Sequence, residues 1–111
     1  MTDPADAGPS APATSAATPI ELVWLVEATY APDGAQTRLP FRAEHIARLQ
    51  ELKRQGIVIE AGAFTDVSAT LIVVRAADEQ AALDLCRDDV YLRNGVWVEL
   101  RARPFGRVRE D

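Results

Sequence analysis

The most constraining feature of this chain is the order in which strand-like and helix-like patterns follow one another. From Ile20 to Ala28 the side chains alternate with a period of two, which predicts a strand. Residues 41–55 instead repeat apolar side chains at three- and four-residue steps, which predicts a helix that ends at Gly56. Two β-branched runs, 57–61 and 70–75, follow with a short link between them and predict an antiparallel hairpin.

The last part of the chain repeats the helix and strand patterns once more. Asp78 is placed to accept hydrogen bonds from the free backbone N–H groups of a helix that runs to about residue 88. Asn94-Gly95 marks a turn, and residues 96–101 alternate as a strand that Pro104 ends or confines to a sheet edge. The complete order, βαββαβ, predicts an α+β, ferredoxin-like domain, with a four-stranded antiparallel sheet and two helices on one face.

The segments outside these elements divide the chain into a domain and two tails. Residues 1–19 are rich in Ala, Pro, Ser and Thr and contain almost no large apolar side chains, so we expect a disordered tail. The domain is expected to span residues 20–108, and residues 109–111 to form a short C-terminal tail. Residues 30–40 carry a Pro-Asp-Gly turn signal and are expected to form a loop.

The charge distribution argues against a nucleic-acid partner. Four of the 17 acidic residues lie in the tails, which leaves 13 acidic and 12 basic residues over positions 20–109, a body close to neutral. RNA-binding domains of this topology display aromatic side chains on their central strands, whereas residues 57–59 and 71–74 are aliphatic. No apolar run of about 18 residues is present, so we expect no membrane association. Since the N-terminus also lacks a secretory signal pattern, we expect a cytoplasmic location.

Several chemistries are set aside by the absence of their motifs. One histidine and one cysteine cannot build a typical zinc site, so we expect no metal. Neither the G-x-G-x-x-G fingerprint nor a phosphate loop is present, and we expect no cofactor. The G-x-S-x-G turn of serine hydrolases is also missing.

The apolar pattern of the strands predicts a homodimer. Two helices cover only one face of a four-stranded sheet. The first and third predicted strands are apolar on both faces, which would leave a large apolar patch exposed in a monomer. A second copy packed against the open sheet face would bury that patch, and a small-molecule ligand is expected in a cleft of the domain.

Five short motifs occur along this series of predicted strands and helices. They are Arg42-Ala43-Glu44-His45-Ile46-Ala47-Arg48-Leu49, the pair Gly56 and Gly62, Asp89-Val90-Tyr91, Asn94-Gly95-Val96, and Arg103-Pro104-Phe105. Together they resemble the YCII family over about residues 20–108. The resemblance implies a dimeric α+β barrel fold with a His–Asp pair as active-site signature, here His45 and Asp89. A few members of the family are linked to dehalogenation or isomerisation in the breakdown of aromatic compounds, so the family does not fix a substrate. Val90 stands where the family commonly has proline.

The residues themselves leave two roles open for His45. His45 is the only histidine, and it shares a helical stripe with Leu49 and Leu52, so it points toward the sheet. Imidazole is well matched to proton transfer near neutral pH, which makes His45 a candidate catalytic residue. An isolated histidine on an apolar stripe is also typical of a structural core residue. Asp89 is either the carboxylate that orients His45 or a turn residue at the end of a helix.

Three further residues are candidates for substrate binding. Arg42 lies one turn before His45 on nearly the same face, where its planar guanidinium would bind a carboxylate or phenolate. Its alternative role is an ion pair with a nearby carboxylate. Trp24 and Tyr30 flank the end of the first strand and would line an aromatic pocket, or else belong to the core and the dimer interface.

These candidates support two hypotheses of different classes. The first is a small cofactor-free enzyme in which His45 and Asp89 carry out proton transfer on a small anionic or aromatic substrate. The reaction would be an isomerisation or an elimination such as dehalogenation. The second is a non-catalytic homodimeric module that binds a small molecule or another protein.

Overall fold

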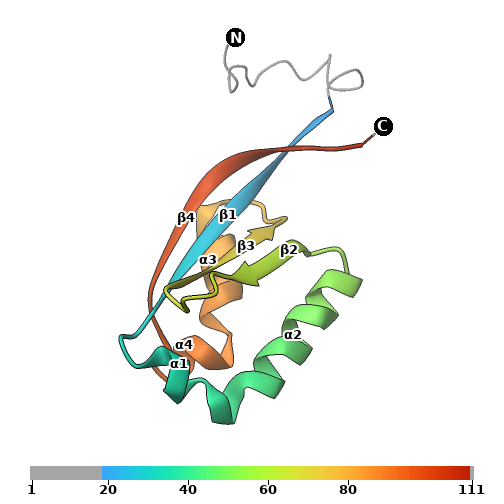
Figure 1. The fold of residues 1–111 in the computed structure, drawn as a ribbon. Helices are drawn as coiled ribbons and strands as arrows, with labels where there is room; N and C mark the ends of the chain where they lie inside the picture. Colours follow the sequence, from blue (N-terminus) through green and yellow to red (C-terminus); the bar gives the residue numbers. More distant parts are fainter. Residues whose placement is uncertain (1–18, 111) are drawn as a thin grey trace.

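The computed structural model describes residues 19–110, so the predicted disordered tail lies almost entirely outside the described residues, as does the last residue of the C-terminal tail. The elements are β1 (Ile20–Tyr30), α1 (Gly34–Thr37), η2 (Leu39–Phe41), α2 (Arg42–Arg54), β2 (Val58–Ala63), β3 (Ala69–Val74), α3 (Glu79–Arg87), α4 (Val90–Arg93) and β4 (Trp97–Val108). The strands form one antiparallel sheet in the order β2-β3-β1-β4. The helices lie on one face of this sheet (Figure 1), which confirms the α+β, ferredoxin-like prediction.

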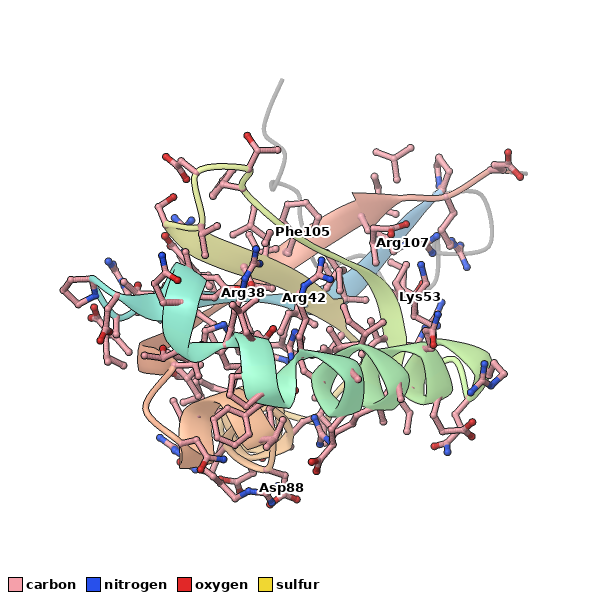
Figure 2. All side chains as sticks on the ribbon, turned by 60° about the horizontal axis from the view of Figure 1, so that its bottom comes forward. Arg38, Arg42, Lys53, Asp88, Phe105 and Arg107 are labelled. Atoms are coloured by element: carbon pink, nitrogen blue, oxygen red, sulfur yellow. The ribbon has the colours of Figure 1, made fainter. Side chains whose placement is uncertain are left out.

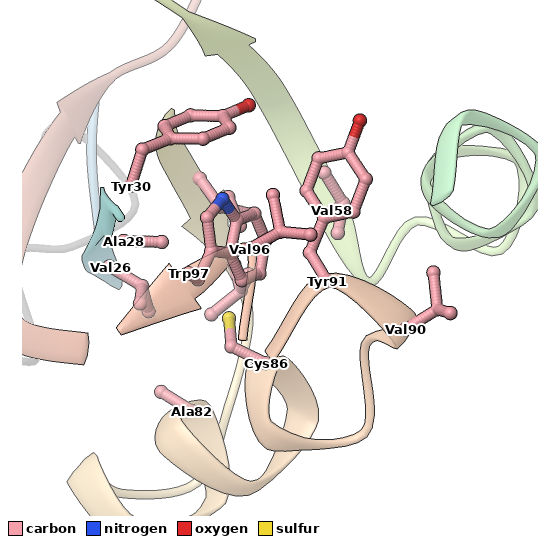
Figure 3. Close-up of a cluster of buried hydrophobic side chains, with 12 residues drawn as sticks. Val26, Ala28, Tyr30, Val58, Ala82, Cys86, Val90, Tyr91, Val96 and Trp97 are labelled. Atoms are coloured by element: carbon pink, nitrogen blue, oxygen red, sulfur yellow. The ribbon is translucent and has the colours of Figure 1, made fainter. Parts of the chain in front are cut away.

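The hydrophobic core fills the space between the sheet and the helices. β1 and β3 contribute the sheet side of the core, with side chains that are almost completely buried from solvent: Val26, Ala28, Ile72 and Val74. The side chains that pack against the sheet come from α3, α4 and the start of β4 (Figure 3): Ala82, Cys86, Val90, Tyr91, Val96 and Trp97. Helix α3 begins as predicted, because the Asp78 carboxylate accepts a hydrogen bond from the Ala81 N–H at 2.8 Å. Within residues 19–110, none of the helices has the length and apolar character that crossing a bilayer requires.

Helix α2 packs beside the edge strand β2 and covers the sheet incompletely (Figure 1). His45 is the one residue of this helix that is buried. Leu49 and Leu52 are half-buried against the core, but Ile46, which belongs to the apolar repeat over residues 41–55, is 39% exposed. The helix ends at the predicted place, because Gly56 adopts φ +77°, which favours glycine.

Residues 30–40 were predicted to form a loop, but two short helices, α1 and η2, form within and just after this segment. Gly34 is buried at the start of α1, in close contact with the ring of Tyr30. A Cβ atom at position 34 would lie 2.8 Å from the Tyr30 Cδ2 atom, which is too close for a side chain. The turn is therefore compact and helical because glycine allows the aromatic ring to pack on the backbone.

The start of β4 also departs from the simple alternation that the sequence predicted. Val96 and Trp97 are both buried, whereas Val98 is 58% exposed. The register between β1 and β4 shifts here, since Thr29 pairs with Glu99 and Tyr30 pairs with Trp97. This irregularity turns Trp97 toward the core, where a regular strand would have directed it to the opposite face.

β1 and β4 extend together beyond the helices as a long two-stranded ribbon (Figure 1). On this ribbon the Glu21 carboxylate accepts hydrogen bonds from Arg75 at 2.6 Å and from Arg107 at 2.9 Å. Arg75 also donates to the Gly56 carbonyl at 2.7 Å, which connects the ribbon to the segment after α2. The hydrogen bonds and positive charge of Arg75, aided by those of Arg107, lower the pKa of Glu21 to about 2.

We predict that Glu21→Gln destabilises the protein in a pH-dependent way. Because the pKa of Glu21 is depressed in the folded protein, the stabilisation is complete above the ordinary value of 4.5 and is lost as pH falls toward 2. The substitution should lower the free energy of unfolding at pH 7 by about 1 kcal/mol. Urea denaturation at several pH values should show this difference shrinking below pH 4.5. Glu51→Gln, an exposed control on α2, should change stability less, and a pH-independent loss for Glu21→Gln would contradict the assignment.

Candidate active site

Asp89 is a buried carboxylate at the junction between α3 and α4. It occupies the N-cap position of α4 in an extended backbone conformation, and its Oδ1 atom accepts a hydrogen bond from the Tyr91 N–H at 2.9 Å. Aspartate is a preferred residue at this position because its side chain satisfies a free N–H group of the first turn. Asp89 is only 1% exposed, so its negative charge requires further partners within the protein.

The partners of Asp89 come from α2. The His45 Nδ1 and Asp89 Oδ1 atoms are 2.8 Å apart, and both side chains are buried. Arg48, one turn later on the same helix, lies 3.5 Å from the second carboxylate oxygen and donates to the Leu85 carbonyl at 2.8 Å. Asp89 thus joins α2 to the α3–α4 junction and compensates its own burial with these contacts.

Two aromatic rings fix the plane of the His45 imidazole. The Tyr91 ring stacks on it with centroids 3.7 Å apart and planes within 9°. The Trp97 ring meets it edge-on at 5.2 Å. Because Asp89 accepts the hydrogen on Nδ1, the second ring nitrogen, Nε2, is the atom that can exchange a proton with a substrate.

His45 lies in the lining of a cleft of about 360 Å³. The cleft is bounded by the start of α2, the β2–β3 hairpin and two tyrosines. The lining residues are Tyr30, Arg38, Arg42, His45, Ile46, Leu49, Ala61, Gly62, Ala63, Phe64, Thr65, Val67, Thr70 and Tyr91. A site of this size, apolar with a few convergent polar groups, has the character of a small-molecule site.

The tip of the β2–β3 hairpin forms one wall of the cleft. Asp66 accepts a hydrogen bond from the Ser68 N–H at 3.0 Å, which closes the turn. Val67 adopts φ +58°, a conformation that β-branched residues rarely take. Its side chain is partly buried against the core and also lines the cleft, so packing holds the turn in this form.

The two tyrosines of the cleft present hydroxyl groups rather than charges. Figure 3 shows the hydroxyls of Tyr30 and Tyr91 directed to the same side, away from Cys86 and Ala82. Burial raises the pKa of Tyr91, and the neighbouring Tyr30 raises it further, so Tyr91 stays protonated at neutral pH. The Thr70 hydroxyl donates to the Tyr30 oxygen at 3.2 Å.

The structure brings together four of the five candidate residues. His45 and Asp89 are in contact, and Tyr30 and Arg42 line the same cleft as His45. Trp24 lies elsewhere: it occupies β1 between Val74 and Pro104, packs half-buried against the core and is not part of the cleft lining. Within residues 19–110 no group of three or more potential ligands gathers in a metal-binding arrangement.

Sequence reasoning missed three residues of the site. Arg38 lines the cleft from the segment that was predicted as an irregular loop. Arg48 and Tyr91 lie within the motifs that carry His45 and Asp89, one helical turn and two residues away respectively. Their positions in those motifs were visible, but the ion pair of Arg48 and the ring stacking of Tyr91 depend on how the helices pack.

The fold and the site together define a ferredoxin-like α+β protein with a buried His–Asp pair beside a cleft. The family model of the YCII-related domain matches residues 22–106, and the chain belongs to this family. An uncharacterized protein of Haemophilus influenzae is 26% identical over 97 residues, which cover 78% of this chain and 99% of that protein.

One solved structure is similar in fold to this chain. It is the 5-chloro-2-hydroxyhydroquinone dehydrochlorinase of Burkholderia phenoliruptrix AC1100, in complex with 2,5-dihydroxybenzoquinone. The similarity covers 75% of this chain and 92% of the dehydrochlorinase, with a TM-score of 0.65 and 16% sequence identity. At this identity the likeness establishes the common fold.

We predict that Asp89→Ala destabilises the protein by about 3 kcal/mol, because it leaves the His45 Nδ1–H and the Tyr91 N–H without their acceptor and Arg48 without its carboxylate. Asp88→Ala is the matched control, since Asp88 precedes Asp89 in the chain and is exposed on the outer surface (Figure 2). It should change stability by less than about 0.5 kcal/mol. Urea denaturation of both variants measures the difference, and equal effects would contradict the buried network.

Proposed function

We propose that this protein is a small enzyme that transfers protons, with His45 as the general acid–base and Asp89 as its orienting partner. The observation that carries the proposal is the 2.8 Å hydrogen bond between two buried side chains at the edge of a small-molecule cleft. A histidine kept only for packing would not require a buried carboxylate beside it, since burying a charge is costly.

The geometry supports a definite assignment of roles. Asp89 holds the Nδ1–H, so Nε2 carries a lone pair that can remove a proton from a carbon or hydroxyl group of the substrate. The imidazolium that forms is then stabilised by the adjacent carboxylate. The stacked Tyr91 ring keeps the imidazole in this orientation throughout the reaction.

The proposed reaction is an elimination or an isomerisation. In an elimination, Nε2 takes the proton, the electron pair of the broken bond forms a new double bond, and a leaving group such as halide departs with its electrons. In an isomerisation, the imidazolium returns the proton to a different atom of the substrate. The same histidine serves as base and then as acid.

The similarity to the dehydrochlorinase structure supports a small aromatic substrate for this protein. It is named as a dehydrochlorinase of a chlorinated hydroxyhydroquinone and holds a dihydroxybenzoquinone, a single oxygenated ring. A cleft of about 360 Å³ in this chain suits a ring of that size. Arg42 and Tyr30 lie in the cleft, as expected for residues that bind an anionic or aromatic substrate.

We further propose that the chain forms a homodimer through the open face of its sheet. A shallow groove of about 470 Å³ on this face is lined mostly by apolar side chains: Leu25, Ala61, Leu71, Val73 and Phe105, together with Glu60 and Gly62. Phe105 is 41% exposed. Packing against a second copy would remove this apolar surface from water.

We predict that His45→Gln strongly reduces turnover of the substrate. A practical probe is 5-chloro-2-hydroxyhydroquinone, with chloride release as the readout. His45→Gln and Asp89→Asn should each lower kcat about a hundredfold or more, because general acid–base catalysis contributes effects of that size. Arg87→Gln, a charge change in the exposed ion pair of α3, is the control and should leave kcat unchanged.

The outcome also separates the two hypotheses for the function. Full turnover by His45→Gln would refute the catalytic role of His45. Saturable binding of hydroxyquinone compounds by the wild type, without turnover of any of them, would favour a homodimeric module that binds small molecules.

We predict that Phe105→Asp converts the dimer into a monomer, because it would bury an unpaired carboxylate in the interface. Leu39→Asp is the control, since Leu39 is also exposed but belongs to η2 and not to the open sheet face. Sedimentation equilibrium at micromolar concentration measures the mass. A wild-type chain of monomer mass under these conditions would exclude the dimer.

A further inference from the structure

The cleft gathers positive charge without a carboxylate to neutralise it. Its lining includes Arg38 and Arg42, and none of the described lining residues is Asp or Glu. By contrast, arginines elsewhere in the fold, such as Arg48, Arg75 and Arg107, lie within 4 Å of a carboxylate. Two guanidinium groups that share a small site and lack an internal counter-ion favour an anion in that site.

One side-chain donor of Arg38 is not satisfied by the described residues. Its Nε atom is buried and has no hydrogen-bond partner within residues 19–110. Arg42 is exposed at the start of α2 and makes no ion pair with a described residue. Figure 2 shows both side chains on the same side of the segment that leads into α2. A buried donor without a partner is costly, and a bound anion would relieve that cost.

The two tyrosines add neutral donors beside the arginines. The Tyr30 oxygen accepts a hydrogen bond from Thr70, so the Tyr30 O–H can be directed elsewhere, toward the cleft. Tyr91 lines the same cleft as Arg38 and Arg42. Tyr91 also stacks on His45, so the donors lie next to the imidazole.

We propose that Arg38 and Arg42, assisted by the hydroxyls of Tyr30 and Tyr91, form an oxyanion site that selects a negatively charged single-ring substrate. The oxyanion is a carboxylate or a deprotonated hydroxyl group on the ring. The site orients the ring beside the Nε2 atom of His45. This inference rests on the proposed function and extends it by naming the residues that determine specificity and the charge of the ligand.

The cleft volume and lining fit this ligand class. A cleft of about 360 Å³ accommodates one substituted ring. Ile46, Leu49 and Phe64 supply apolar surface for the ring, while the arginines and tyrosines supply donors for its oxygen atoms. A neutral ring of the same shape would leave the two guanidinium groups without a counter-ion and should bind more weakly.

The test compares benzoate with benzamide, which has nearly the same shape but no charge. Binding is measured by NMR titration of the full chain, without any turnover. Benzoate should bind saturably at millimolar concentration and benzamide at least about tenfold more weakly, because a charge-assisted hydrogen bond contributes roughly this much. Arg42→Gln should weaken benzoate binding about tenfold and leave benzamide binding unchanged.

Three variants complete the design. Arg38→Gln should weaken benzoate binding as Arg42→Gln does, and Arg42→Gln decides the question if Arg38→Gln fails to fold, since Arg42 is exposed. Tyr91→Phe keeps the ring that stacks on His45 and should reduce benzoate affinity by a smaller factor. Arg87→Gln makes the same charge change outside the cleft and should have no effect on benzoate affinity.

Four results would overturn the oxyanion site. They are the absence of saturable benzoate binding, equal affinities for benzoate and benzamide, unchanged benzoate affinity in Arg42→Gln, and an equal loss in Arg87→Gln. The proposed catalytic role is tested separately, because binding of benzoate requires no proton transfer. Turnover retained by His45→Gln would refute that role while leaving these binding results as they stand.

Discussion

The buried carboxylate of Asp89 is the interaction on which the arrangement of the site depends. It caps α4, accepts the hydrogen of His45 Nδ1 and pairs with Arg48, so one side chain joins α2 to the α3–α4 junction. A carboxylate that is 1% exposed is tolerated only with such partners. The same contacts that offset its burial also determine which histidine nitrogen is available to a substrate. The structural role of Asp89 and its proposed role in orienting His45 therefore depend on the same contacts.

The incomplete cover that α2 gives to the sheet creates the cleft. The helix packs beside the edge strand β2, and its first turns leave Ile46 partly exposed. The space between α2 and the β2–β3 hairpin then collects Arg38 and Arg42 from one side and Tyr30 from the other. The opposite face of the sheet carries its own apolar groove, lined by Leu25 and Phe105 among others. One sheet thus carries the cleft that contains His45 on one face and a proposed subunit interface on the other.

Most of the fold could be predicted from local pattern because the two periodicities are strong. The strand at Ile20, the stop at Gly56 and the cap at Asp78 all depend on residues close in sequence, and the structure confirms each of them. The errors occur where distant contacts override the local pattern. Residues 30–40 fold into short helices because Tyr30 packs on Gly34, and the β1–β4 bulge turns Trp97 into the core. Trp24 was a reasonable pocket candidate by sequence, but the pairing of β1 places it against the core instead.

The sequence by itself determined the order of the four strands and the two longer helices, the membership of the YCII-related family and the identity of the His–Asp candidates. It did so because periodicity, caps and short motifs are properties of neighbouring residues. Only the tertiary structure decided that His45 and Asp89 touch across 44 positions and that Arg38 and Arg42 share a cleft with Tyr91. These relations depend on how α2 and α4 pack around one buried charge, and packing across such separations leaves no local signal in the chain.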